Sequence, residues 1–174
     1  PVTISSTGLT VNDLPDSEGQ AWDSIRHGPV NSQFSTELEG TDFGSGDHSL
    51  LSLHANCGIT FDLATMRTAG LPADVTLNAQ AGYFGQTPRD GASLFVCVDG
   101  KKVWDKEGLG RDDGLQTISI PIPADARFLT LITLDHGNGI GHDQICLADA
   151  NLTTGRSLSD ADKAEIARID EQLR

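Results

Sequence analysis

The chain has few basic residues, few aromatic residues and no long hydrophobic run. Twelve Lys and Arg residues stand against 25 Asp and Glu residues, which gives a formal net charge of −13. Nucleic acids and anionic lipid surfaces are held by clustered Lys and Arg, so this balance argues against both as partners. The longest apolar stretches are far shorter than the ~20 residues that a membrane-spanning helix needs, so we predict no membrane insertion.

The three cysteines give no sign of a paired framework. Cys57, Cys97 and Cys146 lack the close spacing of metal ligands, and an odd number leaves at least one thiol unpaired within a monomer. One disulfide would form only if two of their strands met. We favour the alternative, in which all three are ordinary half-buried residues.

Catalytic signatures are also missing. The sequence has no Gly-x-Ser-x-Gly elbow, no His-Glu-x-x-His pair and no phosphate-cradling loop. His27, His48 and His54 show no helical i, i+4 spacing. The adjacent carboxylates Asp112 and Asp113 lie in a glycine-rich stretch that is typical of a solvated hairpin tip. We therefore predict that the chain is not an enzyme.

What the sequence does contain is a regular alternation of apolar and polar residues, which predicts strands. The alternating segments are Ile59–Leu63, Val75–Ala81, Leu94–Val98 and Ile118–Ile122. Phe128–Leu134 is apolar on both faces, so we expect it to lie centrally in a sheet. Turn signals separate the segments, and Asp99-Gly100 is typical of a two-residue hairpin. The fold class predicted is all-β, an antiparallel two-sheet β-sandwich over residues 1–156.

Residues 157–174 have a different pattern. Ser157–Asp160 offers an N-cap and an acidic first turn, and apolar residues of Lys163–Arg174 fall mostly on one helical stripe. We predict a short C-terminal helix that connects the sandwich to a following domain. The alternative is a helix that packs back onto its own sandwich.

The most informative segment is Thr133–Leu152, in which a polar loop joins two hydrophobic strands. We call residues 135–144 the closing loop. Gly137, Gly139 and Gly141 occupy every second position, which allows turns that residues with a Cβ resist. The polar side chains around them are those that bind a hydroxyl-rich ligand or a hard cation, or that simply cap turns.

Several motifs in this chain resemble those of the NPCBM family, which is close to carbohydrate-binding module family fifty-one. The closing loop is followed by Ala-Asp-x-x-Leu at Ala148–Leu152, as in the family's closing signature. Further similarities lie at Leu38–Phe43, Leu51–Ala55, Phe61–Leu63 and Val98–Lys101, in the family's order. A subgroup with the motifs found here at Ala21–Arg26, His54–Asn56 and Gly139–Gly141 is closer still.

This resemblance implies a jelly-roll fold like that of the galactose-binding domains and a non-catalytic, carbohydrate-binding function. Modules of the subgroup lie inside large bacterial surface or periplasmic proteins, which implies an extracytoplasmic location and neighbouring domains as partners. The ligand implied is a glycan, with a galactose-like sugar as one candidate. Jelly-roll binding modules often hold a structural Ca²⁺, and the Asp-rich turns supply oxygen ligands that suit it; no other cofactor is expected.

We predict that a glycan is bound by loops at one end of the sandwich. The residues predicted to contact it are His54, Arg89, Asp90, His142, Asp143 and Gln144. His54 and Asp90 match positions of the family's pattern, and Arg89 lies beside Asp90. We expect Asp143 to accept hydrogen bonds from sugar hydroxyls, Arg89 to donate them, and the histidines to bond at the sugar's edge.

Aromatic residues for stacking against a sugar ring are scarce, at 5% of the chain. Where the family's closing cluster generally has aromatics, this chain has His142, Gln144 and Leu147. Tyr83, Phe84 and Trp104 are candidates from neighbouring segments, although Trp104 at the end of a hairpin strand is also typical of a core residue. The alternative function is a protein-interaction or spacer domain that keeps only a degenerate sugar site.

Overall fold

The computed structural model describes residues 1–86, 91–154 and 168. Within those ranges every strand pairing is antiparallel. The strands are β1 (Val2–Thr3), β2 (Thr10–Val11), β3 (Ile25–His27), β4 (Glu37–Leu38), β5 (Thr41–Asp42), β6 (Leu50–His54), β7 (Cys57–Asp62), β8 (Val75–Tyr83), β9 (Ala92–Val98), β10 (Lys101–Leu109), β11 (Gln116–Ile122), β12 (Phe128–Leu134) and β13 (Gln144–Thr154).

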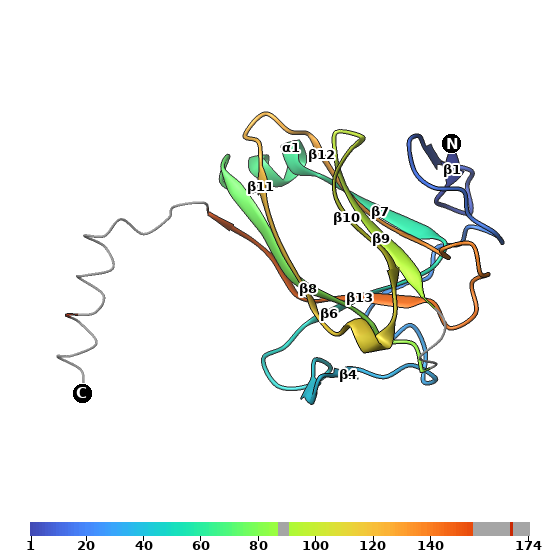
Figure 1. The fold of residues 1–174 in the computed structure, drawn as a ribbon. Coiled ribbons are helices and arrows are strands. Elements are labelled where there is room, and N and C mark those ends of the chain that lie inside the picture. Colours follow the sequence, from blue (N-terminus) through green and yellow to red (C-terminus); the bar gives the residue numbers. More distant parts are fainter. Residues whose placement is uncertain (87–90, 155–167, 169–174) are drawn as a thin grey trace.

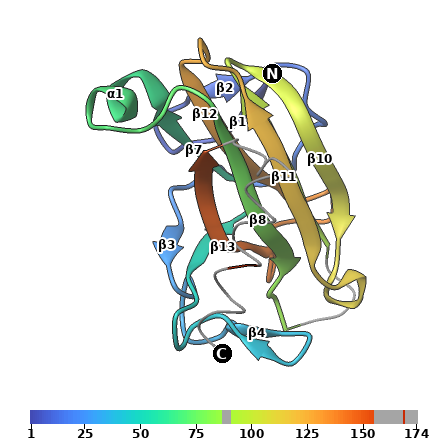
Figure 2. The same cartoon turned by 90° about the vertical axis from the view of Figure 1, so that its left-hand side faces the viewer.

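Two sheets carry most of these strands. The five-stranded sheet has the order β11-β8-β13-β6-β3, and the four-stranded sheet has the order β10-β9-β12-β7. Figure 1 shows the two sheets facing each other, and Figure 2 shows β11, β8 and β13 side by side. The main hydrophobic core draws buried residues from both sheets. The prediction of an all-β, antiparallel fold is confirmed.

The alternation in the sequence explains the register. In β8 the side chains of Val75, Leu77 and Ala79 are buried, and the residues between them are half-buried. Because side chains of a strand point alternately to its two faces, this pattern places one face in the core. β12 is flanked by β9 and β7, as expected of a segment that is apolar on both faces. Asp99 and Gly100 form the predicted turn between β9 and β10, both with positive φ (48° and 76°).

Short N-terminal strands cover parts of the outer faces of both sheets. β1 and β2 form a hairpin whose Val2 and Ile4 region packs on Phe95 and Ile132 of the four-stranded sheet. β4 and β5 form a second hairpin, and Leu38 and Phe43 beside it pack on the five-stranded sheet. Because the two hairpins pack on the outer faces of the sheets, many residues on those faces are hydrophobic and buried.

The helical elements differ from the prediction. The α-helix α1 (Leu63–Thr68) lies mid-chain, where the sequence did not indicate one. The Asp62 side chain caps it by accepting a hydrogen bond from the backbone N–H of Thr65 at 3.1 Å. The 3₁₀-helix η1 spans Arg111–Asp113. The predicted C-terminal helix and the boundary near residue 156 lie, apart from Arg168, outside the described residues.

The cysteines are all free, as interpreted, but they are fully buried rather than half-buried, because both faces of their strands are covered. Burial raises the pKa of Cys57 to about 11 and that of Cys146 to about 12, and it raises the pKa of Cys97 as well. All three therefore remain protonated thiols at neutral pH. In the part of the chain that the structure describes, no helix is both long and apolar enough to cross a membrane.

Candidate functional site

The closing loop lies at one end of the sandwich, between the end of β12 and the start of β13 (orange, Figure 1). Gly137 and Gly139 have φ values of 76° and 83°, in the left-handed region that favours glycine. Gly141 does not require it, whereas His136 and His142 adopt positive φ at 54° and 67°. The glycine pattern therefore indicated a tightly turned loop correctly, although the turns extend to two histidines.

A buried asparagine ties the closing loop to the N-terminal segment. Asn56 is fully buried, and its Oδ1 accepts a hydrogen bond from the Asp135 N–H at 2.8 Å. Its Nδ2 donates to the Glu18 carbonyl at 2.8 Å and to Asp135 Oδ2 at 3.0 Å. The Asn56 carbonyl accepts from the Trp22 N–H at 3.0 Å. One side chain thus fixes three segments that are far apart in the sequence.

His54 and Gln144 lie opposite each other on β6 and β13. Gln144 Oε1 accepts from the Val30 N–H at 2.8 Å, which anchors the segment that covers this end of the sheet. Gln144 Nε2 is buried and has no hydrogen-bond partner among the described residues. The Gln144 side chain also lies close enough to the Cys146 thiol to lower its pKa slightly against the effect of burial.

Two aromatic rings contact His54 edge-on. The ring centroid of Trp22 lies 4.9 Å and that of Phe34 5.5 Å from the imidazole centroid. The Trp22 indole N–H donates to the Ala55 carbonyl at 2.8 Å, so the indole is held in place. Its side chain is nevertheless 40% exposed. Trp22 thus presents a fixed aromatic surface beside the closing loop.

The structure brings four of the six predicted contact residues together and does not describe the other two. His142 is exposed, His54 is almost buried at 6%, and Asp143 and Gln144 have no exposed surface. Arg89 and Asp90 lie outside the described residues. A Cβ on Gly85 would collide with the carbonyl of His142, so the chain at Gly85 lies directly against the closing loop. That all six contact a glycan stays a prediction.

The stacking candidates differ from expectation. Tyr83 and Phe84 are completely buried, and Trp104 packs against the main core, so none presents a free ring face at this end. Trp22 is the aromatic residue that the stacking argument missed. Trp22 is part of the Ala21–Arg26 motif, which indicated the family in the sequence but was not considered as a source of a stacking residue.

We expect His54 to make stability depend on pH. Burial is the main cause that lowers its pKa below the ordinary value, and nearby His142 adds to it, while a bond from Nδ1 to the Ala55 carbonyl opposes the shift. The unfolded chain then binds a proton more readily than the folded one, so stability falls as pH drops below about 6.5. In melts from about pH 7.5 to about pH 5, His54→Gln should lose less stability than wild type. An equal loss in both proteins would contradict this role.

No group of three or more His, Cys, Asp or Glu side chains within the described ranges is placed to hold a metal ion. Calcium also accepts backbone carbonyl and amide oxygens, so a structural Ca²⁺ stays a prediction.

Comparison with known proteins assigns the family. The family model described as the NPCBM/NEW2 domain matches residues 10–153, which is most of the chain. The chain belongs to this family. The resemblance seen in the motifs of the closing segment is thereby confirmed. No curated protein matches the chain.

Solved structures of CBM51 modules share the fold. The CBM51 of a GH95 protein from Clostridium perfringens, in complex with methyl-galactose, is 22% identical with a TM-score of 0.59, covering 83% of this chain and 95% of that one. The CBM51-2 module of ZmpB from the same organism, in complex with GlcNAc, is 14% identical (TM-score 0.59; 75% and 28% covered). The tandem CBM51 modules of a family 98 glycoside hydrolase from Streptococcus pneumoniae are 14% identical (TM-score 0.57; 87% and 47% covered). At these identities the similarity establishes the fold.

Proposed function

We propose that this NPCBM domain is a non-catalytic module that binds a glycan at the closing-loop end of the sandwich. The observation that carries the proposal is Trp22, whose indole is held by the Ala55 carbonyl and by edge contact with His54, yet remains 40% exposed. Fixed, exposed aromatic faces beside polar loops suit the apolar faces and hydroxyl edges of sugars. The methyl-galactose bound by one similar CBM51 module supports a galactose-like ligand.

The predicted residues then act in two layers. Trp22 and His142 form the exposed layer. His54, Asp143 and Gln144 form the buried layer, which holds the loops in place beneath the exposed residues. With one aromatic face and a few hydrogen bonds of roughly 1 kcal/mol each, the affinity should be high micromolar to millimolar.

The module belongs, in this proposal, to a larger bacterial protein that works outside the cytoplasm. The CBM51 modules of ZmpB and of the family 98 hydrolase support this, because they occur beside a catalytic domain and in tandem, respectively. A module of this kind holds its parent protein at a glycan and needs no catalytic group of its own.

A spacer or protein-interaction domain is the second candidate. It is favoured by the burial of Asp143, Gln144, Tyr83 and Phe84, which leaves few polar and aromatic groups exposed at the predicted site. A test of sugar binding distinguishes the two functions, because a spacer domain binds no sugar.

Calorimetric titration with methyl-galactose and with GlcNAc tests the proposal. Trp22→Ala should weaken binding roughly tenfold or more, because it removes an aromatic contact worth about 1.4 kcal/mol. Phe128→Ala is the matched control, since Phe128 is similarly exposed at 37% but starts β12 at the opposite end of that strand from the closing loop. Equal binding by wild type and Trp22→Ala, both folded, would place the site elsewhere. No heat with either sugar would favour the spacer.

A further inference from the structure

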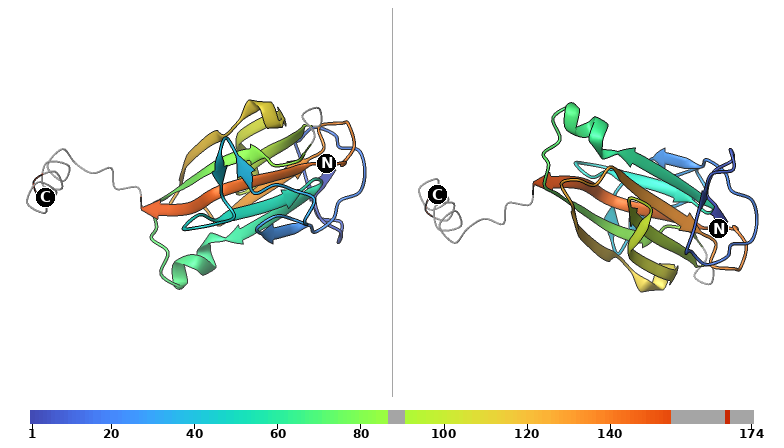
Figure 3. Two further views of the ribbon diagram at one scale, coloured as in Figure 1. Left: turned by 90° about the horizontal axis from the view of Figure 1, so that it is seen from below. Right: turned by 90° about the horizontal axis from the view of Figure 1, so that it is seen from above.

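The outer face of the five-stranded sheet is only partly covered. The β4–β5 hairpin and its flanking residues pack over Leu50, Phe84 and Ala148, and Figure 3 (left) shows this hairpin lying across the sheet. Gly82 of β8 lies under the cover, where a Cβ would collide with Leu38. Beyond Gly82, toward the start of β8, no described segment packs over the sheet in the same way. A groove of about 460 Å³ follows the exposed part of β11, β8 and β13.

Nine residues line this groove: five are neutral and polar, Asp149 is charged, and Ala79, Ile118 and Ala148 are apolar. We call the six that carry the argument the sheet groove: Asn78, Gln80, Thr117, Ser119, Asp149 and Asn151. Asp149, at the edge, is the single charged residue of the six. The polar side chains of the sheet groove are therefore mostly neutral amides and hydroxyls.

The amide and hydroxyl groups are arranged across three strands. Ser119 Oγ donates to Asn78 Oδ1 at 3.2 Å, and Asn78 Nδ2 donates to Thr153 Oγ1 at 2.8 Å. Thr117 Oγ1 donates to Gln80 Oε1 at 3.1 Å. These bonds orient the side chains. Asn78 Nδ2 also donates to the Thr76 carbonyl at 3.3 Å and to Asn151 Oδ1 at 3.5 Å, so its two N–H groups are already used. The amide and hydroxyl oxygens still have acceptor sites for a ligand, because each has two lone pairs.

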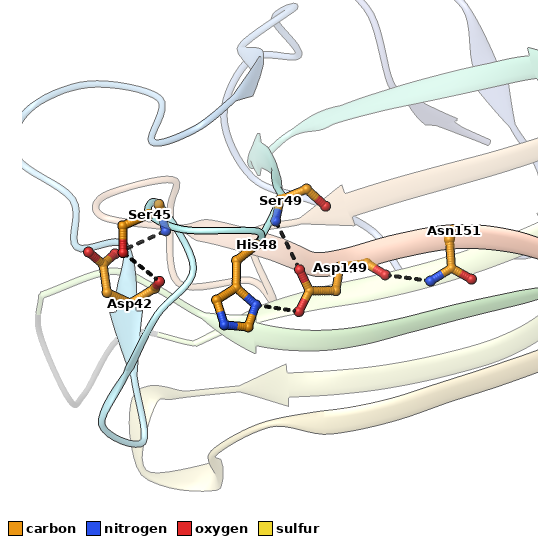
Figure 4. A network of polar contacts seen from close by, with 7 residues as sticks. Asp42, Ser45, His48, Ser49, Asp149 and Asn151 are labelled. Atoms are coloured by element: carbon orange, nitrogen blue, oxygen red, sulfur yellow. Dashed lines mark hydrogen bonds and ion pairs between the residues drawn. The ribbon is translucent and has the colours of Figure 1, made fainter. Parts of the chain in front are cut away.

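Polar contacts around Asp149 border one side of the sheet groove, and Figure 4 shows them. Asp149 lies in the irregular stretch of β13 between Ala148 and Asn151, with φ of 52°. Its Oδ1 accepts from the Ser49 N–H at 2.9 Å and its Oδ2 bonds His48 Nδ1 at 2.7 Å. These bonds hold the pKa of Asp149 below its ordinary value. Asn151 Nδ2 donates to the Asp149 carbonyl at 2.9 Å, which connects Asp149 to the other polar residues of the sheet groove.

We propose that the sheet groove is a second glycan-binding surface, which takes a neutral oligosaccharide along the strands. Sugar hydroxyls both donate and accept, as the Asn, Gln, Ser and Thr side chains do, so the two surfaces are complementary without any net charge. An anionic polymer is disfavoured by Asp149 and by the net charge of −13. With no aromatic side chain among the six, each sugar unit contributes little, so binding requires several units that contact the groove at once.

This surface is independent of the closing-loop site, and nuclear magnetic resonance separates them. The side-chain amide signals of Asn78, Gln80 and Asn151 report on the sheet groove, and the Trp22 indole N–H reports on the closing-loop end. The probes are methyl-galactose, a linear galactohexaose and a linear chitohexaose. At least one hexasaccharide should shift all three amide signals, whereas methyl-galactose should leave them unchanged.

The outcomes are distinguishable. Amides that stay fixed with both hexasaccharides overturn the sheet-groove proposal, and a shifted indole signal in the same spectra leaves the proposed function intact. Shifted amides with a fixed indole support the groove and count against the closing-loop site. Equal shifts of the amides with the monosaccharide would also contradict a surface that needs several units.

A charge variant provides a second test. Thr117→Lys with Asn151→Lys adds two cations at exposed strand positions and should weaken hexasaccharide binding at least tenfold while the Trp22 signal keeps its response. Val103→Lys, at an exposed position of β10 in the other sheet, is the matched control and should bind as wild type. Unchanged binding by the double variant would exclude the sheet groove.

Discussion

Replacing Asn56 with Ala should lower the free energy of unfolding by on the order of 4 kcal/mol, because it leaves buried polar groups without partners. Asn56 is fully buried and makes three side-chain hydrogen bonds of 2.8–3.0 Å to Glu18 and Asp135. The Asp135 N–H and carboxylate, also fully buried, would each lose this partner. The effect is large against the 5–15 kcal/mol of a typical domain.

Urea unfolding followed by circular dichroism measures this change. Asn12→Ala is the matched control, because Asn12 is an exposed asparagine of the N-terminal segment, and it should alter stability by less than about 0.5 kcal/mol. A similarly small effect of Asn56→Ala would mean that water or a shifted loop replaces its hydrogen bonds to Glu18 and Asp135. Asn56 would then not be the residue that joins the N-terminal segment to the closing loop.

The strands could be predicted because local alternation and core burial demand the same pattern. Val75, Leu77 and Ala79 are apolar at every second position, and the core lies on that side of β8. The turn at Asp99-Gly100 was predictable for a similar reason, since two consecutive residues with positive φ need this kind of sequence. In both cases residues close in the sequence determine the structure.

The candidate site could be predicted only in part, because it depends on contacts between distant segments. The polar closing loop was evident, but the sequence did not show that Asp143 and Gln144 are buried. The segment of Val30 and Phe34 contacts Gln144 and His54 from a distant part of the sequence and contributes to the burial of Gln144. Trp22 was missed because no local pattern distinguishes an exposed, anchored indole from one in the core.

Some family landmarks have structural roles in this chain. Leu38 and Phe43, from the motif before β6, are buried in the small cluster beneath the β4–β5 hairpin. Asp149 of the Ala-Asp-x-x-Leu signature holds the backbone of Ser49. The motifs therefore identify the fold more directly than they identify the ligand contacts, which explains why the family was predicted more sharply than the site.

Gly85→Ala should lower the free energy of unfolding by about 2–3 kcal/mol and loosen the closing-loop end, because a new methyl group has no space there. Its Cβ would lie 2.5 Å from two ring carbons of the buried Tyr83 and closer still to the carbonyl oxygen of His142. Neither the Tyr83 ring nor a backbone carbonyl can move without displacing the loop. The backbone at Gly85 must then move away from His142, which should also weaken binding of methyl-galactose if the proposed site is correct.

Gly141→Ala gives the matched comparison within the closing loop itself. A Cβ at Gly141 meets nothing within 4 Å, and its φ lies outside the left-handed region, so this variant should unfold at nearly the wild-type urea concentration. Comparison of Gly85→Ala with Gly141→Ala therefore distinguishes the effect of a steric clash from the general effect of replacing a loop glycine. Equal stability of both variants would show that the two loops are not packed against each other. A Gly85→Ala variant that loses stability but keeps full sugar affinity would separate the contact at His142 from the binding site.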